Sequence, residues 1–474
     1  MSSRHQEVQA IKYIYKESPD INQATNAAAK NVLNCGSSWL LTFLLLFAPL
    51  RQQANSHSRL HDKNLKTRSS KHSVNQKQIK TLPVITTQTK FYSTFASIIW
   101  INNHRIDKMS EYNKRLKVGI TIGDTNGIGI EVVMKAIGIP EMMDLCIPII
   151  YGSSKVVSYH RNACNLPGFQ INHTKSAQNI KDNMPNLVEC IDQDIKIELG
   201  HPSQQAGLAS FLSLEAAVKD LKSGLIDVLV TAPISKDNIQ SEQFHFTGHT
   251  EYLQSAVGDG SKALMILCTA NLRIALATTH LPLTKVSPAL TIEGIREKLQ
   301  QLDASLKRDF NISCPRIAAL ALNPHGGENG MLGNEENDII IPAIQQAVDE
   351  DKIQCFGPYA ADGFFGARHY RRFDGVLAMY HDQGLAPFKT IAMDEGVNFT
   401  AGLPIVRTSP DHGTGYDIAG QGIANESSMR HAIYMAIDVY RHRIAFDEAR
   451  QNPLPKLFQD RGRDNVKLDL TKGE

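Results

Sequence analysis

Three histidines each follow a short apolar run of the kind that forms a buried strand. The runs and their histidines are residues 272–278 with His280, residues 317–322 with His325, and residues 376–380 with His381. In an open α/β sheet, ligands bind beyond the carboxyl ends of the strands. Neutral imidazole is the commonest side-chain ligand for zinc and similar ions, and three histidines with open positions suit a catalytic metal site. The three together predict one metal centre, although each alone is better explained as a hydrogen-bonded loop residue.

A second set of residues suits anion binding. His249 and Thr250 open a predicted helix and offer an imidazole, a hydroxyl and free backbone N–H groups. Lys389, Asn398 and Arg407 are predicted on the connecting segments that follow the His381 strand, where a lysine and an arginine can clamp a phosphate or carboxylate. The predicted chemistry is therefore that of a metal ion beside an anionic substrate.

Two further features are less specific. Lys236 stands just after the predicted strand 226–230, but an exposed loop lysine is the commoner explanation for such a residue. Residues 123–131, GDTNGIGIE, hold three glycines that permit close backbone approach to a phosphate. Their spacing is not GxGxxG, so nucleotide contact and a simple turn from strand to helix both stay open.

The elements that position these residues alternate between strand-like and helix-like segments from residue 109 onward, which predicts an α/β fold. Beyond the three histidine strands, the predicted strands are residues 118–122, 147–151 and 226–230. The predicted helices are residues 208–223, 286–307, 338–350 and 427–443. Residues 164–200 are expected to be irregular at the edge of the fold, residues 356–370 to form a loop, and His381 to lie in a glycine-containing turn.

Charge divides the chain into two parts. Residues 1–108 hold 15 Lys and Arg against 5 Asp and Glu, a net charge of +10, and residues 109–474 hold 35 against 43, a net charge of −8. An acidic body argues against nucleic-acid binding. Seven cysteines are scattered without a CxxC pair, which suits a reducing, cytoplasmic compartment.

Residues 1–108 are rich in Gln, Asn, Ser and Lys and are predicted to form a disordered basic extension. The apolar run at residues 39–50 is too short to span a bilayer, which takes about 20 residues. A transit peptide is one interpretation and a misassigned translation start is the other, because Met109 begins a normal α/β enzyme sequence. Residues 109–450 are expected to form the two-domain body, and residues 451–474 a polar tail.

Five sequence blocks resemble those of a known family. They are FTGHTE at 246–251, ATTHLPL at 277–283, LNPHGGE at 322–328, MYHDQGL at 379–385 and GVNFTAGLPIVRTSPDHGT at 396–414. In this order they make residues 116–445 similar to the 4-hydroxythreonine-4-phosphate dehydrogenases of vitamin B6 biosynthesis. The resemblance implies two α/β/α domains around a cleft, similar to the isocitrate and isopropylmalate dehydrogenases.

The resemblance also implies roles for the site residues. His280, His325 and His381 are expected to bind one divalent ion, Zn, Co or Mg, with the third histidine donated across a homodimer interface. Substrate contacts carry over to residues of the anion-binding set, namely His249, Thr250, Lys389, Asn398 and Arg407. Either His249 or Asp382 is expected to relay the proton, and the sequence does not choose between them.

The implied reaction is the metal-dependent oxidative decarboxylation of 4-phosphooxy-L-threonine with NAD or NADP, giving 3-amino-2-oxopropyl phosphate and CO2. No acidic residue stands on a recognisable ribose-binding turn, so no cofactor-binding residue is assigned. Three alternatives stay open. A related dehydrogenase would act on threonate or erythronate phosphate, a three-histidine phosphoester hydrolase would use water in place of the nicotinamide, and a binding module would be tethered to a membrane or nucleic acid by the basic extension.

Overall fold

The computed structural model describes residues 114–452, all of which belong to one compact unit. The predictions of a basic extension at residues 1–108 and of an apolar run at residues 39–50 lie outside the described residues, as does the predicted polar tail 451–474 apart from its first two residues. Among residues 114–452, no helix is both long enough and apolar enough to cross a membrane.

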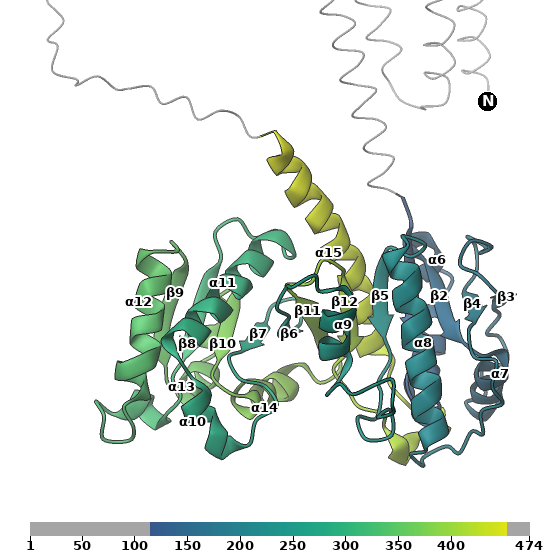
Figure 1. Cartoon of the computed structure of the whole chain (residues 1–474), viewed down its shortest axis with the longest axis horizontal. Coiled ribbons are helices and arrows are strands. Elements are labelled where there is room, and N and C mark those ends of the chain that lie inside the picture. Colours follow the sequence, from purple (N-terminus) through teal and green to yellow (C-terminus); the bar gives the residue numbers. More distant parts are fainter. Residues whose placement is uncertain (1–113, 453–474) are drawn as a thin grey trace, which may run out of the picture. The chain divides into compact units, whose positions relative to one another are not determined.

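Twelve strands of the described chain form one continuous sheet in the order β3-β4-β2-β1-β5-β12-β11-β6-β7-β10-β8-β9 (Figure 1). Their bounds are β1 Leu116–Thr121, β2 Cys146–Gly152, β3 Asn172–Thr174, β4 Asn186–Glu189, β5 Val228–Thr231, β6 Leu264–Cys268, β7 Arg273–Leu276, β8 Arg316–Leu320, β9 Gln354–Tyr359, β10 Gly375–Ala378, β11 Val397–Ala401 and β12 Arg407–Pro410. The predicted α/β class is confirmed. The division of residues 109–450 into two domains stays a prediction.

Helices cover both faces of the sheet. They include α5 Gly129–Ile137, α6 Met142–Leu145, α7 Ser154–Ala163, α8 Gln204–Lys222, α9 His249–Val257, α10 Val286–Ala289, α11 Ile292–Arg308, α12 Ile341–Asp349, α13 Ala361–Gly366, α14 His381–Ala392 and α15 Ser427–Gln451. On one face, α5, α11, α12 and α15 share a single buried apolar cluster with the strands. On the other face the core is divided, because α8 and α9 belong to a second cluster and α13 and α14 to a third.

The strands that carry the three predicted metal ligands lie side by side. β10 pairs in parallel with β7 on one edge and with β8 on the other. Their carboxyl ends therefore meet at one side of the sheet, as predicted. The segment after β10 is the helix α14, however, and the predicted turn at His381 is wrong. Gly384 does not turn the chain there: it lets α14 pack closely, since a Cβ at this position would lie 2.9 Å from Ile274 and Leu276 atoms.

The last two strands of the chain, β11 and β12, lie in the middle of the sheet and connect its two halves. β12 pairs in parallel with β5, and β11 pairs antiparallel with both β12 and β6. Asn398 therefore lies on β11, Arg407 on β12 and Lys389 within α14, so the prediction that all three lie on connecting segments is wrong. Helix α15 packs against β12, β5 and β11.

Other predicted elements are partly wrong at their boundaries. The predicted helix 286–307 breaks after α10, where Leu290 is extended and the Thr291 hydroxyl accepts a hydrogen bond from the Gly294 N–H to cap α11. The predicted helix 338–350 begins as a π-helical turn, η5 (Glu336–Ile340). The predicted loop 356–370 contains most of β9 and all of α13, and the predicted irregular segment 164–200 contains the short edge strands β3 and β4.

The predicted helix 208–223 is confirmed as α8, but part of its predicted apolar face is wrong. Leu208, Leu212 and Ala216 are only partly buried, whereas Ser210 and Ser213 are fully buried. The two serine hydroxyls donate hydrogen bonds to the carbonyls of Gly123 and Tyr151, which lets α8 pack closely on the sheet. Buried serines with backbone partners are not visible in an apolar pattern.

Candidate active site

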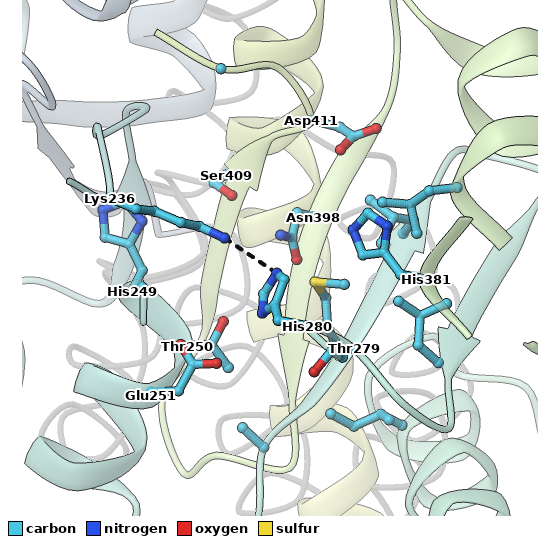
Figure 2. A pocket seen from close by; sticks show the side chains of 18 of the residues that line it. Lys236, His249, Thr250, Glu251, Thr279, His280, His381, Asn398, Ser409 and Asp411 are labelled. Carbon is cyan, nitrogen blue, oxygen red and sulfur yellow. Dashed lines mark hydrogen bonds between the residues drawn. The ribbon is translucent and has the colours of Figure 1, made fainter. Parts of the chain in front are cut away.

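A cavity of about 570 Å³ lies where the core of one face is divided, between α9 and α14 and over β11 and β12. Its size suits a small-molecule ligand. Eight of the nine predicted site residues line it: His249, Thr250, His280, His381, Asp382, Lys389, Asn398 and Arg407. His325 does not. Figure 2 shows His249, Thr250 and Glu251 on one side of this cavity and His381 on the other, with His280 between them.

Arg407 provides a buried positive charge at the cavity. Its side chain is 2% exposed, and its guanidinium donates hydrogen bonds to the hydroxyls of Thr231 (2.6 and 3.0 Å) and Thr400 (3.0 Å). Burial lowers the pKa of Arg407 to about 10, so the group is still protonated at neutral pH. It makes no ion pair with a carboxylate of residues 114–452. A buried cation held only by hydroxyls is strongly suited to bind an anionic ligand.

His249 and Asn398 present unpartnered polar atoms at the same cavity. His249 is the first residue of α9, and its Nε2 atom is buried without a hydrogen-bond partner in the described chain. The Oδ1 atom of Asn398 is also buried without a hydrogen-bond partner in the described chain. Burial, together with the charges of Arg407 and Lys236, holds the pKa of His249 well below its ordinary value. Because buried polar atoms nearly always have partners, these two mark positions for ligand contact.

The other end of the cavity carries a lysine and a polar turn. The Lys389 ammonium donates to the Asp411 carbonyl at 3.2 Å and lies 3.7 Å from the Asp411 carboxylate. Burial raises the pKa of Asp411, and Lys389 partly opposes the shift. The adjacent His412 also has a buried, unpartnered Nε2 atom, and burial lowers its pKa.

His280 and His381 form an imidazole pair. Their ring centroids are 5.8 Å apart. The Lys236 ammonium lies 3.2 Å from His280 Nε2 (Figure 2), and burial followed by this positive charge lowers the pKa of His280. His381 Nδ1 donates to the Asp382 carboxylate at 2.7 Å, which orients the ring and leaves Nε2 as the nitrogen available to a metal. Two imidazoles, one of them beside the Lys236 ammonium, fit two ligand positions of a divalent metal ion.

His325 lies apart from this pair. It follows β8 in a loop with left-handed backbone angles, and its side chain is exposed. Within residues 114–452, no group of three His, Cys, Asp or Glu side chains is arranged to hold a metal ion. A single chain therefore brings together two of the three predicted metal ligands.

Several polar residues that line the cavity were not assigned to the site from the sequence, among them Lys236, Glu251 and His412. Lys236 follows β5, whose carboxyl end lies beside Arg407, so its place after a strand was the available signal. Glu251 directly follows the predicted pair His249 and Thr250 on α9. His412 belongs to a polar turn after β12, and nothing in the sequence indicated that its side chain would line the cavity.

Comparison with known proteins decides the family. Residues 144–436 match the family model described as pyridoxal phosphate biosynthetic protein PdxA. The chain is 53% identical over 361 residues to a 4-hydroxythreonine-4-phosphate dehydrogenase of Bacteroides thetaiotaomicron, across 76% of this chain and 98% of that one. The chain belongs to the 4-hydroxythreonine-4-phosphate dehydrogenase family. It is therefore an oxidoreductase.

Other members of the 4-hydroxythreonine-4-phosphate dehydrogenase family and their relatives match over a similar range. A crystal structure of this dehydrogenase from Klebsiella pneumoniae superposes with a TM-score of 0.60 at 30% identity, covering 69% of this chain and 98% of that chain. A protein of Oceanobacillus iheyensis, provisionally named a D-threonate 4-phosphate dehydrogenase, is 37% identical over 333 residues, 69% of this chain and 98% of that one. The resemblance inferred from the five sequence blocks is thus confirmed.

Proposed function

We propose that the chain catalyses the metal-dependent oxidative decarboxylation of 4-phosphooxy-L-threonine with NAD or NADP, giving 3-amino-2-oxopropyl phosphate and CO2, in pyridoxal phosphate biosynthesis. One observation carries the proposal. The buried Arg407 guanidinium, with no carboxylate partner in the described chain, faces the same cavity as the His280 and His381 imidazoles. A cation-binding pair beside an anion clamp suits a phosphorylated hydroxy acid that is oxidised at its hydroxyl.

Each group of residues has a part in this reaction. Arg407 and Lys389 hold the substrate's anionic groups, and Asn398 and Thr250 supply hydrogen bonds that orient the carbon bearing the hydroxyl. His280 and His381, with His325 as the third ligand, would hold a divalent cation, which would supply Lewis acidity toward that hydroxyl. NAD or NADP would supply the hydride acceptor. The hydroxyl loses its proton, the product is a β-keto acid, and loss of its carboxyl group as CO2 is followed by protonation of the adjacent carbon.

The two candidate proton acceptors differ in their surroundings. The Asp382 side chain is 84% exposed and hydrogen-bonded to His381, so it orients the imidazole. His249 has a buried, unpartnered Nε2 atom and a lowered pKa, which keeps its imidazole neutral and able to accept a proton. We therefore assign the proton acceptor to His249 and an orienting role to Asp382.

The proposal includes a homodimer, because the third histidine must come from a second copy. Exposed apolar side chains directly follow the His325 loop, Met331 (80%) and Leu332 (45%), and others lie in the segment after β7, Leu281 (44%) and Leu283 (72%). The hydrogen bond from Ser287 to Glu335 joins the segments that carry them. A cluster of exposed large apolar residues suits a protein interface. A second copy seated here would bring His325 to the other chain's cavity.

The substrate assignment follows the most similar relative above. The Bacteroides protein named for 4-hydroxythreonine 4-phosphate is 53% identical, and the Oceanobacillus protein named for D-threonate 4-phosphate is 37% identical. The former substrate class is therefore favoured.

The hydrolase alternative is not supported by membership of a dehydrogenase family. The six cysteines within residues 114–452 are free thiols, which supports a cytoplasmic location.

The test is a substrate panel with the purified chain. Phosphorylated four-carbon amino and hydroxy acids are offered with NAD or NADP, with and without a chelator, and reduced nicotinamide and released phosphate are both measured. We expect reduced nicotinamide with 4-phosphooxy-L-threonine, together with CO2, and its loss with chelator. Phosphate release without nicotinamide reduction would establish the hydrolase instead, and undiminished turnover in chelator would remove the metal from the proposal.

A further inference from the structure

The loop that carries His325 has an unusual backbone. Six consecutive residues, 325–330, all have positive φ, and three of them are not glycine: His325 (φ 52°), Glu328 (φ 44°) and Asn329 (φ 55°). Left-handed angles are unfavourable for residues with a Cβ atom, and they persist where surrounding contacts fix them. The loop must therefore be held by groups outside it.

Glu336 holds the start of this loop. The residue is 2% exposed, and its Oε1 atom accepts hydrogen bonds from the backbone N–H groups of Leu322 and Asn323, both at 2.8 Å. Its Oε2 atom accepts from the Asn323 side-chain amide at 3.0 Å. The carboxylate thus binds the residues that immediately precede Pro324 and His325.

The loop also folds directly over this carboxylate. A Cβ atom at Gly327 would lie 2.7 Å from Glu336 Oε2, so only a glycine at this left-handed position (φ 77°) leaves room for the carboxylate. Glu336 also opens the π-helical turn η5, an element that is frequent at functional sites. No Lys or Arg of residues 114–452 makes an ion pair with Glu336, so the buried carboxyl group is held by N–H donors of Leu322 and Asn323, just before the loop. Burying a carboxylate costs desolvation free energy, so a contribution to stability does not by itself explain why Glu336 is buried here.

We propose that Glu336 is a positioning residue that fixes the backbone of residues 323–330 and thereby aims His325 at the cation held by His280 and His381 of a second copy. The inference rests on the proposed function, in which His325 is the third metal ligand. Metal ligands must be held within about 0.5 Å of their working geometry, and a carboxylate with three donors at the start of the loop can hold its backbone in place. The His325 side chain is exposed and has no hydrogen-bond partner within residues 114–452 to orient it, so the backbone must do so.

The first test measures metal affinity with Glu336→Gln, which keeps the size of the side chain and removes one of its two acceptor oxygens. Zn²⁺ is titrated calorimetrically into the metal-stripped full chain, and thermal unfolding is followed in parallel. We expect the Kd for Zn²⁺ to rise about tenfold or more, the range found for groups that orient metal ligands. The matched control is Glu350→Gln, since Glu350 pairs with Arg296 and contacts neither of the backbone N–H groups that Glu336 binds. Its Kd should change less than about twofold. A lower melting temperature with an unchanged Kd in Glu336→Gln would make the residue merely structural and overturn the proposal.

The second test places the substitution in one subunit of a mixed dimer. A His280→Ala subunit paired with a His325→Ala subunit should keep one intact site, made from the second subunit's His280 and His381 and the first subunit's His325. Glu336→Gln in the His280→Ala subunit should then weaken Zn²⁺ binding and turnover, whereas the same change in the His325→Ala subunit should not. Equal effects of the two placements would overturn the positioning role.

The two tests separate the inference from the proposed function. If the mixed dimer without any Glu336 change has no activity, the shared site of the proposed function fails. The Zn²⁺ titration of Glu336→Gln then decides the inference by itself, because an unchanged Kd contradicts it under either arrangement of the site.

Discussion

The two sides of the cavity differ in how much of their function one chain completes. The side formed by α9, β11 and β12 is buried and ordered within a single chain: Arg407 is fixed by two threonine hydroxyls, and His249 and Asn398 already face inward. The opposite side carries the His280 and His381 pair, while His325 is exposed on a separate loop. The proposed anion site is therefore complete within one chain, whereas the proposed metal site needs a further ligand.

This difference separates two requirements of the proposed reaction. An anionic substrate would find its buried cation in a monomer, because the guanidinium and its hydroxyl partners come from neighbouring strands of one sheet. Oxidation at the hydroxyl would need the third imidazole. Substitutions on the two sides should therefore have different effects on metal content, substrate binding and turnover.

The largest effect is expected from the incomplete side. Either His280→Ala or His325→Ala should lower metal content and reduce kcat/KM by about 10³-fold or more, since a Lewis acid contributes several kcal/mol to the transition state. Metal analysis and steady-state kinetics measure the two quantities. Full activity in a metal-free His325→Ala enzyme would remove the basis of the comparison, because that residue does not line the cavity of its own chain.

A smaller loss is expected from the completed side. Arg407→Met should reduce kcat/KM by about 10²- to 10³-fold, because loss of a buried charge partner costs about 3 to 4 kcal/mol. Metal content should stay at the wild-type level. Arg296→Met serves as the control, since Arg296 pairs with Asp351 away from the cavity. Loss of metal in Arg407→Met would show that the two sides do not act separately.

His249 on the completed side should make stability depend on pH. Its pKa in the folded chain lies well below the ordinary value of 6.5, so the unfolded chain binds a proton that the folded chain does not. Stability is therefore fully present above about pH 6.5 and is lost as the pH falls, by at most about 1.4 kcal/mol per pH unit for this one group. Urea unfolding at several pH values should show a shallower loss in His249→Asn. An identical pH dependence in both proteins would contradict the burial of a neutral His249.

The smallest effect is expected at a site that belongs to neither side. Thr291→Ala removes the hydroxyl that caps α11 and should lower the free energy of unfolding by about 1 kcal/mol. Denaturant unfolding measures this loss. The ratio kcat/KM should stay at its wild-type value, and a clear decrease would mean that α11 transmits changes to the cavity.

Much of the site could be predicted from local sequence. Short apolar runs ending in histidine predict buried strands, and parallel pairing of β7, β10 and β8 places those ends together. Eight of nine predicted residues line one cavity. Strand pairing accounts for His280 and His381, and the start of helix α9 accounts for His249 and Thr250. The unpredicted part depends on the sheet as a whole. Arg407 was placed on a connecting segment because β11 and β12 are short and separated by Gly402 and Pro404, which local reasoning takes for loop residues.

His325 shows the limit of such reasoning most clearly. The position of β8 brings its carboxyl end beside that of β10, which favours a shared metal site within one chain. His325 does not line the cavity of its own chain, and the buried Glu336 carboxylate binds Asn323 and Leu322, thirteen and fourteen residues earlier in the chain. Neither the handedness of successive loop residues nor a distant carboxylate partner follows from periodicity.

The central place of β11 and β12 also bears on how the chain is made. These strands lie between β5 and β6, although they come after β10 in sequence. The ribosome must therefore synthesise all the residues before 397 before the two halves of the sheet can be joined. Until then β5 and β6 each have a bare edge, which is a template for intermolecular pairing. Nascent chains stalled before residue 397 should therefore depend on chaperones and should not retain a phosphorylated ligand.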